Sequence, residues 1–336
     1  MSGGLQSDAG RHMAAEIAEA PGVFARAIAA KVALPDLAGL RAVYTIARGS
    51  SDAAANILSY EVMREAGLPM TSLPPSVFSL GGGVTLDGAA VLVVSQSGAS
   101  EDLVRSARGA RARGARVLGI INAEASPVAG AADAVLPIGA GPEIAVPATK
   151  SVVGSIGAGM ALISAMVPGY AARAEVAAAE VAALAGRSHP QARALVAALL
   201  RARHVYVIGR DSGFGAAQEL ALKLKECCAL HAEAYSSSEV LHGPLQLATN
   251  PLLVLILDTG QAGVQASLDT AEARLAAAGG TVFRLRPSDA GLGAMTPAAA
   301  AAALLCLTYP LVLQTALALG LDPDAPATLS KVTQTR

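Results

Sequence analysis

The residues best suited to chemistry form one polar stretch, Ser95-Gln96-Ser97-Gly98-Ala99-Ser100-Glu101-Asp102. It follows residues 89–94, a short, uniformly apolar, β-branched segment that predicts a strand buried on both faces. It precedes residues 103–114, whose Arg and Ala pattern predicts a surface helix. At such a junction the unpaired N–H groups and the dipole of the helix favour an anion.

Two interpretations of this stretch compete. Serine is a common cap and turn residue, so the stretch is either a capped loop or a binding site. Three serines and a glutamine within six residues exceed what capping needs, and Gly98 lets the backbone come close to a ligand. We therefore expect a site for phosphate or a similar anion.

A second set of polar residues, Glu219, Lys223 and Glu226, lies within a predicted helix over residues 213–230. Spacings of four and three place the three side chains on one helical face. The opposite stripe, predicted to be buried, consists of Ala216, Leu220, Leu224 and Cys227. The charged face is either a solvated row of ion pairs or part of a functional site.

Two further residues are candidates because of their position. His242 precedes Gly-Pro at the end of a short helix-like stretch, within twenty residues of the Lys/Glu face. It is either a structural histidine or a general acid–base. Lys331 lies in a tail with little helical character, where its amine is either a nucleophile or a surface charge.

Strands and helices alternate along the chain, which predicts parallel sheets with helices on both faces. In the first half we expect strands at 42–47, 89–94, 117–121 and 135–138, with helices between them and an apolar helix to about 167. An amphipathic helix over 11–31, broken near Pro21, is expected to pack outside the main domains.

The chain also repeats itself. Residues 43–50 return as 205–212, and residues 91–98 return as 253–260, both at an offset of 162. Two strand–turn matches at one spacing indicate two copies of a doubly wound α/β domain with a helical linker between 169 and 204. In the second copy the serine-rich loop has become Asp258-Thr259-Gly260, whose carboxylate would repel a phosphate.

Composition excludes several classes of protein. The 336 residues carry a net charge of −1 with scattered charges, which argues against nucleic-acid binding. Three cysteines and five histidines do not form a disulfide framework or a metal site. No N-terminal signal is visible, so a cytoplasmic location is expected. Residues 297–320 are long enough to span a bilayer, but polar interruptions favour a buried helix pair.

Seven segments together resemble the tandem sugar-isomerase (SIS) domain family, which includes the isomerase half of glucosamine-6-phosphate synthase. The similarity runs from about Glu16 to the tail. The segments occur in family order, at 47–51, 95–98, 143–150, 221–226, 231–235, 242–244 and 329–333. The resemblance implies two flavodoxin-like domains at 35–170 and 195–325, an N-terminal helical segment at 1–34 and an active-site tail at 326–336.

The resemblance also implies roles for individual residues. Glu226 matches the carboxylate that moves a proton between C1 and C2, and Lys223 would stabilise the enediol(ate). His242 matches the ring-opening residue that the neighbouring subunit supplies, which implies a homodimer. Lys331 matches a lysine that forms an imine with the open-chain ketose. The implied substrate-binding residues are Ser50, Ser51, Ser95, Gln96, Ser97, Ser100, Val146 and Ala148.

These roles imply an aminosugar-phosphate isomerase/deaminase that needs no metal or cofactor and converts glucosamine-6-phosphate to fructose-6-phosphate and ammonia. Two departures from the synthase matter. The glutamine-hydrolysing domain is expected to be absent, and Ala148 stands where the synthase pattern has a serine. A galactosamine-6-phosphate deaminase, a fructosamine-6-phosphate deglycase and a non-catalytic sugar-phosphate sensor remain alternatives.

Overall fold

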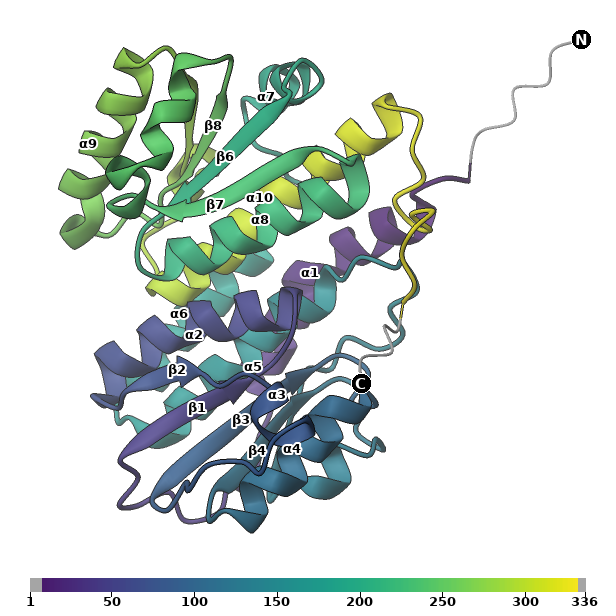
Figure 1. Ribbon diagram of the computed structural model, residues 1–336, viewed down its shortest axis with the longest axis vertical. Coiled ribbons are helices and arrows are strands. Elements are labelled where there is room, and N and C mark those ends of the chain that lie inside the picture. Colours follow the sequence, from purple (N-terminus) through teal and green to yellow (C-terminus); the bar gives the residue numbers. More distant parts are fainter. Residues whose placement is uncertain (1–7, 332–336) are drawn as a thin grey trace, which may run out of the picture.

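The computed structural model describes residues 8–331 and contains two separate parallel β-sheets, one in the lower and one in the upper half of Figure 1. The predicted α/β class with two doubly wound parallel sheets is confirmed. The predicted segments at 1–34 and 326–336 lie partly outside the described residues.

The first sheet has five strands in the order β2-β1-β3-β4-β5, all parallel. The strands are β1 (Ala42–Ile46), β2 (Met70–Ser72), β3 (Ala89–Ser95), β4 (Arg116–Ile121) and β5 (Ala134–Pro137). The four predicted strands are all present. Strand β2 was not predicted, because it is a three-residue edge strand whose Thr71 and Ser72 are exposed and it therefore lacks an apolar pattern.

Strand β3 is buried along its whole length, as its composition predicts. Leu92 and Val94 face the core that the two halves share, whereas Val91 and Val93 face a separate cluster beneath the outer helices. Because both faces of the strand are covered, every position is apolar until the chain reaches Ser95 at the carboxyl edge of the sheet.

The second sheet repeats the first four strands in the order β7-β6-β8-β9. Its strands are β6 (His204–Gly209), β7 (His231–Ser236), β8 (Leu253–Leu257) and β9 (Thr281–Leu285). The predicted correspondences of β1 with β6 and of β3 with β8 agree with this order. Strand β7 lacked a periodic signal because it is a half-buried edge strand of polar composition.

A helical layer fills the space between the two sheets (Figure 1). It consists of α1 (Arg11–Ala29), α2 (Ser50–Ala66), α5 (Lys150–Met166), α6 (Tyr170–Ala182), α8 (Ser212–Cys228) and α10 (Pro297–Ala318). The remaining α-helices are α3 (Ser76–Ser79), α4 (Glu101–Ala112), α7 (Ala192–Leu199) and α9 (Ala262–Ala277). One continuous apolar cluster joins the inner faces of both sheets to the middle helices.

The prediction for the first helix was wrong in two respects. Helix α1 continues through Pro21, and it packs against α5 inside the shared core. An interior proline costs a helix about 3 kcal/mol. Met13, Val23 and Phe24 are each fully buried, and such burial stabilises by about 1.5–3 kcal/mol per side chain, which offsets that cost.

The prediction of a buried helix pair over 297–320 was also wrong, because α10 is one helix with Pro310 inside it. By length and composition it could cross a membrane, but 78% of its most apolar window is buried inside the fold. It packs against α8, α5 and α1, so its apolar surface belongs to the core of this structure.

Candidate functional site

The polar residues of the first half gather at the carboxyl edge of the first sheet. Strand β1 leads through Gly49 into α2, and β3 leads through residues 96–100 into α4. These strands are neighbours whose connections leave in opposite directions, which makes their edge the usual ligand site of this topology. Ser50 and Ser51 therefore lie beside the Ser95–Ser100 loop.

The serine-rich loop is held in shape by its own hydroxyls. Ser95 Oγ accepts the Gly98 N–H at 2.9 Å, and Ser97 Oγ accepts the Ala99 N–H at 3.3 Å. Gly98 has φ +60° and lies against Ser126, so it makes the turn possible. Gln96, Ser97 and Ser100 remain partly exposed at the mouth of the loop.

A cation that was not among the predicted site residues lies next to this loop. Arg48 is half exposed and donates from Nε to Oδ2 of Asp102 at 2.5 Å, whereas Oδ1 of the buried Asp102 has no hydrogen-bond partner. Because Arg48 follows β1 and Asp102 lies in the first turn of α4, the pair joins both sides of the loop. The sequence feature that could have identified Arg48 is its position directly before Gly49-Ser50.

The second copy of the loop is closed by its own carboxylate. Asp258 is fully buried, accepts the Gly260 N–H at 2.8 Å, and receives Arg284 and Arg286 at 2.9 Å each. Burial would raise the pKa of Asp258, but the bond from Gln265, the Gly260 N–H and the arginines lower it overall. An anion already occupies the position at which a phosphate would bind.

Helix α8 brings its charged residues to Ser50 because it crosses α2 very closely. A Cβ on Gly215 would lie 2.7 Å from the Ile57 nitrogen and 2.8 Å from the Ala53 oxygen, so only glycine permits this approach. Lys223 Nζ then donates to Ser50 Oγ at 2.9 Å. The solvated-face interpretation of α8 is wrong, because Glu219 and Lys223 are fully buried against α2 and α10.

Lys223 is shared between two carboxylates. It donates to Glu226, whose side chain is about one-quarter exposed, and lies 3.5 Å from Oε1 of Glu219. Burial alone would lower the pKa of Lys223, but the two carboxylates raise it above its ordinary value. The lysine therefore stays charged, and Glu226 is the carboxylate of this trio that solvent can reach.

Glu219 is held from its other side by a residue of the core. Tyr309 in α10 donates its hydroxyl to Glu219 Oε1 at 3.1 Å, whereas Oε2 has no hydrogen-bond partner. Burial raises the pKa of Glu219 to about 7, although Lys223 opposes the rise. The pKa of Tyr309 is raised by its burial, by Glu219 and by the nearby Glu143. The sequence feature that could have identified Tyr309 is a hydroxyl group within a long apolar helix.

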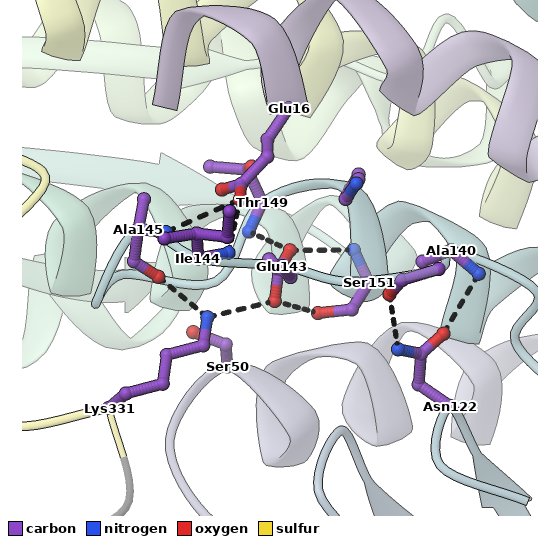
Figure 2. Close-up of polar contacts among 12 residues, drawn as sticks. Glu16, Ser50, Asn122, Ala140, Glu143, Ile144, Ala145, Thr149, Ser151 and Lys331 are labelled. Carbon is purple, nitrogen blue, oxygen red and sulfur yellow. Dashed lines mark hydrogen bonds and ion pairs between the residues drawn. The ribbon is translucent and has the colours of Figure 1, made fainter. Parts of the chain in front are cut away.

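Lys331 approaches the site from the C-terminal tail (Figure 2). Its Nζ donates to the main-chain oxygen of Ala145 at 2.6 Å and lies 3.2 Å from Oε2 of Glu143. The loop that Lys331 contacts, residues 143–149, follows β5 and leads into α5. Figure 2 shows how Lys331 reaches this loop through Glu143 and Ala145.

Two carboxylates that were not among the predicted site residues hold this loop. Glu143 accepts the N–H groups of Thr149 and Ser151 at 3.0 Å each, which stabilises the start of α5. Glu16 of α1 accepts the N–H groups of Ile144 and Ala145. Burial, opposed by these bonds, raises the pKa of Glu16. Sequence spacing could not reveal the contact of Glu16 with this loop, because the two are more than 120 residues apart.

One of the two hydrophobic residues that were predicted to line the sugar site, Val146, is held by a residue just before the tail. The Val146 N–H donates to the Asp324 oxygen at 2.9 Å, and the Asp324 carboxylate accepts the N–H groups of His12 and Met13. Val146 and Ala148 are partly buried on this loop. Ala148 offers no side-chain donor.

His242 stands apart from the other predicted site residues. It ends a short 3₁₀ helix, η2 (Glu239–His242), as the sequence suggested, and its side chain is exposed. Between residues 8 and 331 it makes no hydrogen bond or ion pair with any of them. Its assigned role across a subunit interface stays a prediction.

No cluster of three or more potential metal ligands occurs among the described residues. Cys227, Cys228 and Cys306 are buried, and burial raises the pKa of each thiol to about 12. These thiols therefore stay protonated near neutral pH.

Comparisons with known proteins identify the family. The model of the SIS domain matches residues 36–165 and 198–283. A glutamine–fructose-6-phosphate aminotransferase [isomerizing] from Zymomonas mobilis is 34% identical over 74% of this chain and 44% of its own length. The chain spans about half the length of such curated relatives.

Two solved structures share the fold. One, from Silicibacter pomeroyi DSS-3 and proposed to be a phosphosugar isomerase, is 33% identical with a TM-score of 0.79, covering 93% of this chain and 99% of its own. A glucosamine-6-phosphate deaminase from Thermotoga maritima is 20% identical with a TM-score of 0.75, covering 96% and 100%. The chain belongs to the SIS domain family.

Proposed function

We propose that this protein is an aminosugar-phosphate isomerase/deaminase that converts glucosamine-6-phosphate to fructose-6-phosphate and ammonia. The observation that carries the proposal is the contact of buried Lys223 with both Ser50 and Glu226. This contact places a cation and a solvent-accessible carboxylate next to the serine loops of the first sheet. An aldose–ketose shift needs a proton shuttle and a cation to stabilise the intermediate.

The residues suit successive steps of one reaction. The phosphate of the substrate would bind at Ser50, Ser51 and the Ser95–Ser100 loop, where helix N-termini favour anions. After His242 of the partner subunit opens the sugar ring, Glu226 would take the proton from C2. Lys223 would stabilise the negative charge that develops on the intermediate.

The same carboxylate completes the proton transfer. Glu226 would return the proton to C1, while the C1 oxygen gains a proton and the amino nitrogen loses one, which leaves a C2 imine of the ketose. One water then adds at C2, and ammonia leaves, so that one molecule of water is consumed for each ammonia released. The proposal assigns no step to a metal or cofactor, and it places the active homodimer in the cytoplasm.

Ammonia release from purified protein and glucosamine-6-phosphate tests this proposal. The Glu226→Gln variant should lose at least about 10²-fold in kcat, because a general base contributes 10²–10⁴-fold, while sugar-phosphate binding persists. The Glu175→Gln variant removes the same charge from an exposed position on α6 and should retain full activity. Ammonia production by Glu226→Gln at the wild-type rate would contradict the role of Glu226.

A substrate panel separates the alternatives. Turnover of galactosamine-6-phosphate in preference to glucosamine-6-phosphate would show that the substrate has the C4 configuration of galactosamine. Release of an amine from phosphorylated fructosamines would indicate a deglycase. Binding of sugar phosphates with no turnover of any panel member would replace the enzyme with a sensor.

A further inference from the structure

A second cleft lies at the amino edge of the second sheet, where β6, β7, β8 and β9 begin. Its volume is about 1130 Å³, large enough for a phosphorylated metabolite. The lining includes His204, His231, Leu253 and Thr281, the first residues of the four strands. The phosphate loop follows β3 of the other sheet, so this cleft is distinct from the candidate active site.

The charged groups of this cleft are all basic. Arg201 and Arg203 line it together with His204 and His231, and no aspartate or glutamate does. Neither arginine forms an ion pair within residues 8–331. At the amino edge of the first sheet, by contrast, Arg111 is paired with Asp133 at 3.1 Å. The whole chain has a net charge of −1, so the positive charge of this cleft is confined to one part of the surface.

The two histidines point toward each other across adjacent strands. His204 and His231 are register partners in the β6–β7 ladder, and their Nδ1 atoms lie 3.1 Å apart. One ring must donate to the other in this contact, so the rings orient each other. Their Nε2 atoms make no hydrogen bond within the described residues, and Asn250 adds a side-chain amide to the lining.

The same histidine pair could in principle hold a transition metal. Two nitrogens supply only half of a tetrahedral set, and no third metal-ligating side chain joins them in the described part of the chain. Two arginines beside the pair repel a cation and attract an anion. Electrostatics therefore favours a phosphate group over a metal ion.

We propose that this cleft is a second ligand site, which binds a phosphorylated small molecule through Arg201, Arg203 and the imidazole pair. Arginine suits this role because its guanidinium group donates two parallel hydrogen bonds to phosphate oxygens. The apolar residues of the cleft would contact the rest of the ligand. His231 follows Glu226 by five positions, so the ligand would contact the segment directly after α8.

Calorimetric titration with inorganic pyrophosphate tests the proposal without any assay of turnover. Because the first-domain loop also attracts anions, the titration uses the Ser97→Asp variant, whose added carboxylate repels phosphate there. Binding should persist in this variant. Adding Arg201→Gln and Arg203→Gln should weaken it at least about tenfold, the loss of one good charge-assisted hydrogen bond.

The control is Arg193→Gln, which removes one exposed arginine of α7 outside the cleft and should leave the affinity unchanged. Since Arg201 and Arg203 are also exposed, the variant should keep the parent's thermal midpoint. Equal pyrophosphate affinity with and without the two arginines would overturn the proposal. So would tighter binding of Zn²⁺ than of pyrophosphate that His204→Ala abolishes, because the site would then be a metal site.

Discussion

Glu219 shows how much a single side chain can reveal about this site. It is fully buried between Lys223 and Tyr309, and one of its oxygens has no hydrogen-bond partner. A carboxylate in this position serves the site by holding Lys223, which in turn contacts Ser50 and Glu226. Its ionisation should therefore be visible in the stability of the whole protein.

The Glu219→Gln variant tests this link between ionisation and stability. Burial raises the pKa of Glu219 from 4.5 to about 7, so the folded state holds its proton more tightly than the unfolded state. The corresponding stability is present below pH 4.5 and is lost as pH rises through 7, by up to about 3 kcal/mol. Thermal unfolding of the wild type should weaken more between pH 5 and 8 than that of Glu219→Gln. Parallel pH profiles would show that Glu219 does not titrate there.

A substitution can separate the ion pair of Lys331 with Glu143 from the imine that this lysine is proposed to form with the ketose. Lys331→Arg keeps a cation near Glu143 but cannot form an imine with a ketose. Treatment with fructose-6-phosphate and borohydride should add one reduced sugar phosphate to the wild type, detected by intact mass, and none to the variant. Equal labelling of both proteins would place the imine on another lysine.

At the scale of elements, the site depends on how closely α8 crosses α2. Gly215→Ala adds a Cβ that would meet the backbone of α2 at less than 3 Å. We expect a loss of about 1–3 kcal/mol in the free energy of unfolding, measured in urea, because the helices must separate. Activity should fall as well, since Lys223 would move away from Ser50.

Gly263 in α9 provides the matched control, because an added Cβ there meets no atom within 4 Å. Gly263→Ala should stabilise the protein by up to about 1 kcal/mol, as expected for alanine within a helix. A Gly215→Ala variant as stable and active as Gly263→Ala would mean that the crossing does not position Lys223.

The elements differ in how well the sequence predicts them. Strands β3 and β8 are apolar on both faces and recur at a fixed offset, so local pattern and repeat identify them together. The edge strands β2 and β7 are partly exposed and polar, and therefore carry no periodic signal. Helix α1 was misplaced because its burial depends on α5, more than 120 residues away.

The same distinction applies to the site. Serines at strand ends and the spacing of Glu219, Lys223 and Glu226 are local patterns, so the sequence alone could single these residues out. Tyr309 takes part only because α10 packs against α8. Glu16 and Glu143 act on backbone groups, which no residue pattern marks.

At the scale of the whole molecule, His242 is exposed and makes no hydrogen bond or ion pair within residues 8–331, as expected if a second copy completes the proposed active site. If so, mixing Glu226→Gln with His242→Ala under conditions that exchange subunits should restore activity. In each mixed dimer one of the two sites holds both native residues. Half of randomly paired dimers are mixed, so about one-quarter of wild-type activity should return.

The control for this experiment is an assay of each variant alone, without mixing. Each alone should be nearly inactive in the ammonia assay, and recovery should depend on mixing. Failure of the mixture to exceed the sum of its parts, with exchange verified by mass spectrometry, would place His242 in the same subunit as Glu226 or outside the chemistry.

The single core that joins both sheets limits how substrate can enter. A hinge motion that opened the two halves would separate α8 from α2 and expose buried residues such as Ile57 to water. Each such side chain would cost about 1.5–3 kcal/mol, so wide opening is too rare to serve every turnover. In the proposed reaction, sugar phosphate and ammonia must therefore enter and leave through the loops at the rim, while the two halves stay closed around the core.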